Sequence, residues 1–383
     1  MSASLELNSP VLLHRLRRAR EGCGLSQEEV AENLNMSRTT VVAIEAGERV
    51  LRPTELIDLA ELYDEPLDSL LRKSSPPRDL AAQFRTAAGK QPEHDQLRRA
   101  AMELQRLSED YLELERLTGA NLPDRYPPPQ DLAKDGDRAA EWLAESERRR
   151  LSLGDGPLPH IREILESDVG LRIFAINLPS RVGGLFAFDD DLGACVAMNA
   201  NQRWERQRWS LAHEYAHFLT RRNRAEITIV LSEYRRVPAT ERFADDFARY
   251  FLLPTNGIRR RWESAVASHS PATASLLLEH ADWWGVSFQA FVLRLEGLKL
   301  IRPGTHQSFM SRGFAVDEGR AMLELRPREA DSRLLPRRYR LLAVMAFAEG
   351  MISEERLARF LHEDRLAART AVAELAAASA EDG

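Results

Sequence analysis

The sequence predicts a mainly α-helical protein with a small β-sheet, the α+β class. Apolar residues recur at intervals of three and four over most of the 383 residues, which indicates amphipathic helices. Two apolar runs, residues 171–177 and 185–199, instead predict strands, and the second holds an acidic turn. Stretches rich in proline and serine, residues 72–79 and 122–131, break the chain into separate parts.

Composition narrows the class of protein. No run approaches 18 consecutive apolar residues, so we expect no membrane span. The first basic cluster follows the short apolar stretch, which is the wrong order for a secretory signal. Two distant cysteines, Cys23 and Cys195, disfavour a disulfide scaffold and fit a reducing cytoplasm. The net charge of −6 means that any DNA binding is confined to one part of the chain.

Residues 11–71 predict several short helices joined by tight turns. Within LSQEEVAENLNMSRTTVVAIEAG, one helix ends at a turn formed by Asn35 and Met36. A second helix begins at Ser37, a good N-cap, and ends at Gly47. Three apolar residues of this second helix are expected to face the core: Val41, Val42 and Ile44.

Polar residues at the start of these two helices can read DNA. Arginine pairs with guanine, and serine and threonine bond to phosphates or bases. The predicted DNA-binding residues are Gln27, Ser37, Arg38, Thr39 and Thr40. The runs LSQEEVA, SRTTVVAIEAG and LIDLAELY resemble the Cro/C1-type (XRE) helix-turn-helix family over residues 11–71. This resemblance implies binding to an operator in double-stranded DNA, and we expect a homodimer because one helix-turn-helix reads few bases.

Charge leaves a second interpretation of this segment open. Residues 11–73 hold nine Lys and Arg against twelve Asp and Glu, and a domain of this fold can also bind a protein. Arginines before and after the motif favour DNA, although they could also form a solvated helix face: Arg15, Arg17, Arg18, Arg20, Arg49 and Arg52.

Residues 72–136 are predicted to form a linker and one amphipathic helix over 94–118. The apolar positions of this helix alternate steps of three and four: Leu97, Ala100, Leu104, Leu107, Tyr111 and Leu114. This spacing fits a dimer seam and a helix packed on its own chain equally well.

The stretch WSLAHEYAHFLT, residues 209–220, holds a candidate metal site. On a helix, His213 and His217 lie one turn apart on the same face and can bind one ion. Zinc accepts nitrogen and oxygen ligands and lowers the pKa of a bound water to about 7. Glu214 lies beside the ion and can act as the general base. Surface histidines on a polar helix are the alternative interpretation, but the apolar residues that flank the motif indicate a buried helix.

The stretch ERFADDFARYFLLP, residues 241–254, offers a third ligand. Its apolar residues follow helical spacing, so Glu241 and Asp245 share one face. Two histidines with Glu241 form a catalytic zinc set that leaves one position open. Asp245 can accept the other ring N–H of a ligating histidine, or it can be a surface charge.

These two motifs together resemble the ImmA/IrrE family of zinc metallopeptidases. The resemblance covers residues 137–302 and extends to the VAMN stretch before the motif helix and to ADWWGVSFQAFVLRLEGLKLI after it. It implies a zincin-like (gluzincin) peptidase domain with a Zn²⁺ held by His213, His217 and Glu241, and with Glu214 as base. It also implies cleavage of a protein substrate, often a DNA-binding repressor.

The remaining region, residues 303–383, is predicted to be helical. Residues 351–376 form a helix, a turn and a helix, which fits a plain helical hairpin or a second helix-turn-helix. Together these features predict a cytoplasmic bacterial transcription regulator that carries a peptidase domain. Two alternatives stay open: a repressor whose zinc domain only senses a ligand or metal, and a protease whose helix-turn-helix binds a protein.

Overall fold

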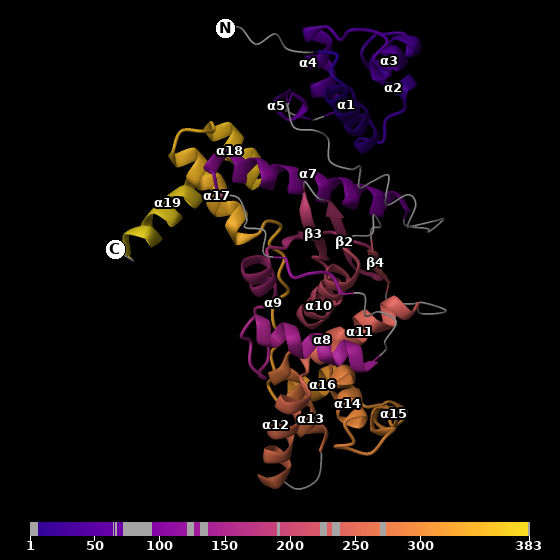
Figure 1. The fold of residues 1–383 in the computed structure, drawn as a ribbon, viewed down its shortest axis with the longest axis vertical. Coiled ribbons are helices and arrows are strands. Elements are labelled where there is room, and N and C mark those ends of the chain that lie inside the picture. The colour runs from indigo at the N-terminus through magenta and orange to yellow at the C-terminus, as the bar shows by residue number, and fades with distance from the viewer. Residues whose placement is uncertain are drawn as a thin grey trace. The chain divides into compact units, whose positions relative to one another are not determined.

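The computed structural model describes residues 7–63, 65, 67–71, 94–120, 126–130, 137–189, 192–222, 228–231, 238–268 and 273–381. The chain divides into two compact units, Met1–Asp79 and Leu80–Gly383 (Figure 1). Over the described ranges, we find no helix with the length and apolar character needed to cross a membrane. The predicted linker at 72–79 lies outside the described residues.

The first unit consists of short helices whose ends are set by serine caps. The side chains of Ser9, Ser26 and Ser37 each accept a backbone N–H in the first turn of a helix. The helices are α1 (Pro10–Gly22), α2 (Gln27–Asn33), α3 (Arg38–Glu45), α4 (Pro53–Leu62) and α5 (Leu67–Leu70). One buried apolar cluster joins them, and it includes Leu12, Leu16, Val30, Val41, Ile44, Leu56 and Leu59.

One residue of α3 differs from the prediction. Val41 and Ile44 are buried, but Val42 is 39% exposed. Successive residues of an α-helix lie about 100° apart, so Val41 and Val42 cannot both face one narrow core contact. Val42 instead shares the exposed face with Arg38, one turn earlier.

The second unit is built on a four-stranded sheet with the order β1-β3-β2-β4. Strand β1 (Arg172–Ile176) pairs in parallel with β3 (Gly193–Asn199). Strand β2 (Val182–Asp189) pairs antiparallel with both β3 and β4 (Thr228–Leu231). The strand β4 was not predicted from the sequence.

Helices cover both faces of this sheet, because successive side chains of each strand enter different cores. Ile173 and Val196 join the core that contains α8 (Asp137–Arg150), α10 (Trp204–Arg221) and α11 (Ala239–Leu252). Phe174 and Ala197 join the other core, which contains α7 (His94–Thr118) and the C-terminal helices (Figure 1). The C-terminal helices are α17 (Arg337–Ala348), α18 (Glu354–Leu361) and α19 (Arg365–Glu381).

Helix α7 therefore packs on its own chain. Its predicted apolar stripe, from Leu97 to Leu114, is buried against the sheet and α17. The C-terminal hairpin of α18 and α19 also joins this core through Leu357, Phe360 and Ala368.

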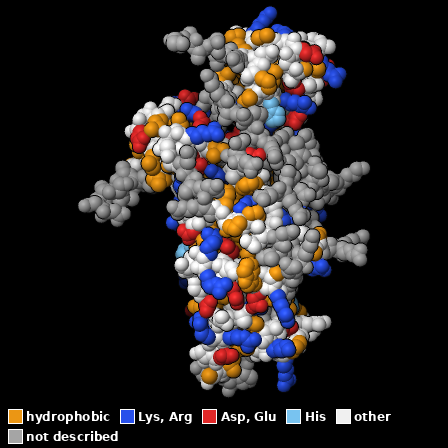
Figure 2. Space-filling model, in the orientation of Figure 1, with side chains coloured by type: hydrophobic (Ala, Val, Ile, Leu, Met, Phe, Trp, Pro, Cys, Tyr) orange, Lys and Arg blue, Asp and Glu red, His pale blue; other side chains and the backbone are white. Residues whose placement is uncertain are grey.

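The core beneath the other face continues into further helices. They are α9 (Ile161–Ile164) with the π-helical turn η1 (Leu165–Val169), α12 (Thr255–Ser268), α13 (Ala274–Trp284), α14 (Phe288–Gly297), α15 (Thr305–Ser311) and α16 (Val316–Met322). Side chains of both charges are interspersed over the visible face of the molecule (Figure 2).

An irregular segment after α16 leads to α17 along the edge of the sheet. The backbone N–H of Ala175 in β1 donates to the carbonyl of Leu334 at 3.2 Å. The carboxylate of Asp331 lies 3.1 Å from Arg162 and 2.7 Å from Arg333. Burial opposes ionisation of Asp331, but the hydrogen bond from Arg333 and the charge of Arg162 outweigh it and lower its pKa to about 2.

Candidate functional site

Helices α10 and α11 bring the predicted metal ligands together in the buried core of the second unit. His213 and His217 lie one turn apart on α10, and their Nε2 atoms are 3.1 Å apart. The carboxylate of Glu241 on α11 lies 3.2 Å from His213 Nε2 and 3.4 Å from His217 Nε2. One ligand atom from each residue lies within 4.8 Å of the others. The three side chains therefore converge on one point.

Asp245, one turn after Glu241, contacts the other side of the same imidazole. Its Oδ1 atom lies 2.9 Å from His213 Nδ1 and accepts a hydrogen bond from Trp209 Nε1 at 3.4 Å. Because Nδ1 is engaged in this way, Nε2 is the ring nitrogen that faces Glu241 and His217. The role of Asp245 in orienting His213 stays a prediction.

Glu214 lies next to His213 and is 1% exposed. Among the described residues, neither of its carboxylate oxygens has a hydrogen-bond partner. The close neighbour of this carboxylate is Gly184 in β2, where an added Cβ would lie 3.0 Å from Glu214 Oε1. A buried carboxylate without a partner costs free energy and therefore suggests a functional role.

The ionisable groups at the site shift one another's pKa values. Burial opposes the protonated form of His213, but hydrogen bonds to Asp245 and Glu241 raise its pKa to about 9. Burial lowers the pKa of His217 and raises the pKa of Glu214 to about 8. The pKa of Glu241 falls far below its usual range, because hydrogen bonds from both histidines outweigh the effect of burial. The cluster thus favours one positive charge between the imidazoles and Glu241.

The cluster fits a zinc ion in donor type and arrangement. Two imidazole nitrogens and one carboxylate oxygen are a donor set for catalytic zinc, and they converge from two adjacent helices. Asp245 supplies the carboxylate that commonly accepts the second N–H of a ligating histidine. A divalent cation also satisfies the cluster's preference for positive charge.

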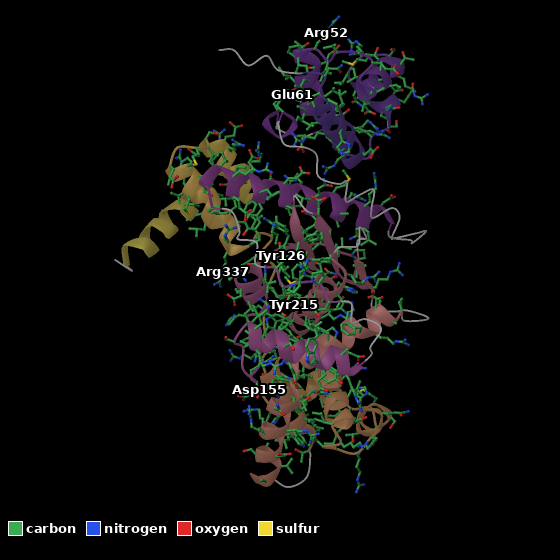
Figure 3. All side chains as sticks on the ribbon, viewed as in Figure 1. Arg52, Glu61, Tyr126, Asp155, Tyr215 and Arg337 are labelled. Carbon is green, nitrogen blue, oxygen red and sulfur yellow. The ribbon has the colours of Figure 1, made fainter. Side chains whose placement is uncertain are left out.

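Buried polar contacts also hold α10 against α8. Tyr215, labelled in Figure 3, lies between the two histidines in the sequence of α10. Its hydroxyl donates to Glu147 on α8 and accepts from Arg150 at 2.9 Å. These contacts were not predicted. No role was predicted for Gly184 or Trp209 either, although a glycine inside a strand often marks a place where another segment approaches the backbone closely.

In the first unit, the predicted DNA-binding residues lie at the start of α2 and α3. Ser37, Arg38 and Thr39 are exposed, and Thr40 is half-buried. Ser37 Oγ accepts the N–H of Thr40 at 3.1 Å and lies 2.8 Å from the hydroxyls of both threonines. Ser37 thus caps α3, and Arg38 extends beside Glu28 at 3.5 Å with 63% of its side chain exposed.

Gln27 and several arginines of this unit are tied to internal contacts. The amide of Gln27 donates to Glu45 at 2.8 Å. Arg20 pairs with the same carboxylate at 2.6 Å and is buried, as is Arg15. Arg15 and Arg20 therefore hold the unit together and do not contribute to an exposed basic face. Arg49 pairs with Glu55 at 2.7 Å.

Comparison with known protein families gives two matches. Residues 166–296 match the family model described as the IrrE N-terminal-like domain, and residues 16–70 match the one described as helix-turn-helix. No curated protein matches the chain. The first match indicates a metallopeptidase-like domain and the second a DNA-binding type of domain. The chain thus joins a helix-turn-helix domain of the Cro/C1 type to a domain of the ImmA/IrrE type, as the sequence predicts.

Proposed function

We propose that this protein is a cytoplasmic DNA-binding transcription regulator whose second unit is a zinc-dependent peptidase. Its substrate would be a protein, either a repressor or this chain itself. The observation that carries the peptidase proposal is the convergence of His213, His217 and Glu241 beside the carboxylate of Glu214, which has no hydrogen-bond partner in the part of the chain that the structure describes.

His213, His217 and Glu241 hold the zinc ion in this proposal, and Asp245 fixes the orientation of His213. When bound, zinc polarises the scissile carbonyl and stabilises developing negative charge. With a cation held beside it, Glu214 would be ionised, and it would accept a proton from the attacking water and pass it to the leaving amine. Neither oxygen of Glu214 has a hydrogen-bond partner among the described residues, so both are available for this transfer.

DNA recognition is assigned to the exposed face of α3. Arg38 can pair with a guanine, and Thr39 can bond to a phosphate or base. Val42 lies one turn beyond Arg38 and adds an exposed apolar surface, which suits contact with a thymine methyl group. A homodimer would place two such helices on a near-palindromic operator. Gln27 would support this recognition surface indirectly, because its side-chain amide donates a hydrogen bond to Glu45.

The peptidase proposal is tested with zinc-loaded wild type and Glu214→Gln. Each protein is incubated with cell extract, with and without operator DNA, and fragments are mapped by mass spectrometry. Fragments that appear with wild type alone support peptide hydrolysis. Cuts within residues 72–92 or 119–131, most of which lie outside the described residues, would identify self-cleavage, whereas fragments of another protein would identify a partner.

One result would overturn the proposal. If neither kind of fragment appears while DNA binding is intact and responds to a small ligand, the second unit is a sensor. A pull-down with Glu214→Gln provides an independent check, because a variant that holds zinc without the base should retain an uncut substrate.

A further inference from the structure

A pocket of about 1000 Å³ lies beside the candidate metal centre in the second unit. Trp209 and Asp245 both line it, and both belong to the hydrogen-bonded group that contacts His213. The volume is at the upper end of the range for small-ligand pockets, so the space suits several side chains of a peptide.

The two site helices carry residues from the metal centre into this pocket. On α11, Glu241, Asp245 and Arg249 follow one another at intervals of four, so they share one face of the helix. On α10, Trp209 precedes His213 by one turn and also lines the pocket. A peptide held at the metal centre can therefore extend along these two helices into the pocket.

The charged residues that line the pocket favour an anionic occupant. Five arginines line it against three carboxylates: Arg203, Arg206, Arg249, Arg320 and Arg328 against Glu205, Asp245 and Asp317. Asp245 is engaged with His213 and Trp209. Arg320 is held by Asp282 at 2.8 Å and by Glu205 at 3.6 Å, so it is less available to a ligand.

Arg203 and Arg249 are the better candidates for direct contact. Arg203 precedes α10 and pairs with Asp317 of α16 at 3.2 Å, but 79% and 71% of the two side chains are exposed. Exposed ion pairs contribute little stability, so a ligand carboxylate can replace Asp317 at low cost. Arg249 pairs with Asp246 on its own helix at 2.6 Å, and 37% of its side chain is exposed.

Part of the pocket lining is apolar. Phe288 and Leu293 of α14 line the pocket, and Leu293 is 46% exposed. An exposed leucine in a pocket gains from contact with an apolar side chain. The pocket therefore combines cationic and apolar surfaces.

We propose that this pocket binds the substrate segment next to the scissile bond and selects an acidic peptide. Arg203 and Arg249 pair with carboxylates of that segment, and Leu293 contacts a neighbouring apolar side chain. This inference rests on the proposed peptidase function and adds a substrate class to it.

The test uses the full-length chain loaded with zinc and a proteome-derived peptide library. In one arm, wild type cuts the library and the cut sites are read by mass spectrometry. In the second arm, immobilised Glu214→Gln retains peptides, which are eluted and identified. Both arms are repeated with Arg203→Gln and Arg249→Gln combined. Arg260→Gln is the matched control, because Arg260 forms an exposed pair with Asp155 at 2.9 Å and does not line the pocket.

We expect Asp and Glu to be enriched near the cut sites and in the retained peptides. The double variant should reduce that enrichment roughly three- to tenfold, and the control should preserve it. Cleavage without acidic enrichment would overturn the pocket assignment and leave the peptidase function standing. Acidic retention that depends on the two arginines, without cleavage by wild type, would support the pocket and overturn the peptidase function. Loss of enrichment in the control as well would also overturn the assignment.

Discussion

The candidate metal centre and the candidate DNA-reading helix place their functional residues in opposite environments. His213, His217 and Glu214 are at most 2% exposed and are fixed by neighbours on two helices and a strand. Arg38 and Thr39 are exposed, and they contact other exposed side chains of the same unit. A buried polar residue requires an internal hydrogen-bond partner or a functional role, whereas water satisfies an exposed one.

This difference determines what the structure contributes to each proposal. At the metal centre, three donor atoms converge beside Glu214, whose carboxylate has no partner among the described residues. This arrangement supports a specific reaction, in which a bound metal ion acts together with a carboxylate base. In the first unit, the structure instead separates two arginines: Arg20 of α1 is buried in an ion pair with Glu45, whereas Arg38 of α3 is exposed and free to contact a ligand.

The largest effect is expected from removing a ligand. His213→Ala or Glu241→Ala should abolish zinc binding and peptide cleavage, because each leaves only two protein donors. Glu214→Gln should keep about one zinc per chain but lose cleavage. Elemental analysis of each purified variant measures the zinc. Full occupancy in Glu241→Ala would exclude Glu241 as the third ligand and make Asp245 the candidate.

Removal of two different arginines of the first unit should affect two different properties, the stability of the unit and its binding to DNA. Arg20→Ala leaves the half-buried Glu45 with only its hydrogen bond from Gln27 and should destabilise the unit by about 1 to 3 kcal/mol. Arg38→Ala should leave stability unchanged and cost about 1 to 3 kcal/mol in binding to a specific DNA site. Urea unfolding and a DNA-binding titration on residues 1–383 measure the two quantities. If Arg38→Ala binds the operator like wild type, α3 does not read DNA through this residue.

Gly184→Ala should impair catalysis without removing the metal. The added methyl group would lie 3.0 Å from Glu214 Oε1 and from the carbonyl oxygen of Ala197, so the carboxylate must move. Misplacement of a reacting group by about 1 Å can lower a rate roughly a hundredfold. The contact at Gly184 requires a smaller shift, of a few tenths of an ångström, so we expect kcat to fall roughly three- to tenfold while zinc content and KM stay near wild type. Substitution of Gly183, its neighbour in β2, is the control, and an equal loss there would point to damage of the strand.

The smallest effect concerns Asp331 at the edge of the sheet. Its pKa is about 2 in the folded protein, below the usual value of about 3.9, so it stabilises the fold fully above about pH 4. That contribution, about 2 kcal/mol, is lost as the pH falls through about 2. Asp331→Asn should therefore be less stable than wild type at pH 7, and the difference should shrink below pH 4. Urea unfolding from pH 7 to pH 3 measures it, and a constant difference would contradict the ion-pair account.

Local patterns predicted the elements of this chain better than its long-range contacts. Helix spacing placed His213 and His217 on one face and aligned Glu241 with Asp245, because these relations depend only on the period of a helix. The spacing could not show that α7 covers the sheet, since a dimer seam requires the same pattern. Val42 was wrongly predicted to face the core, because an apolar residue type alone does not show which face of a short helix is directed toward the core.

Contacts between distant segments needed the structure. Gly184 and Glu214 meet only after β2 and α10 pack together, and the pocket beside the site combines α10, α11, α14 and α16. The segment between α16 and α17 likewise gains its partner Arg162 only in the folded unit.

The central claim is that His213, His217 and Glu241 form a zinc centre, and X-ray absorption at the zinc edge tests it most directly. The full-length chain, purified with zinc, should show only nitrogen and oxygen neighbours at about 2.0 to 2.2 Å, with the multiple-scattering signal of two imidazoles. His217→Ala should lose that signal. A sulfur neighbour at about 2.3 Å, or an unchanged imidazole signal in His217→Ala, would contradict the assignment.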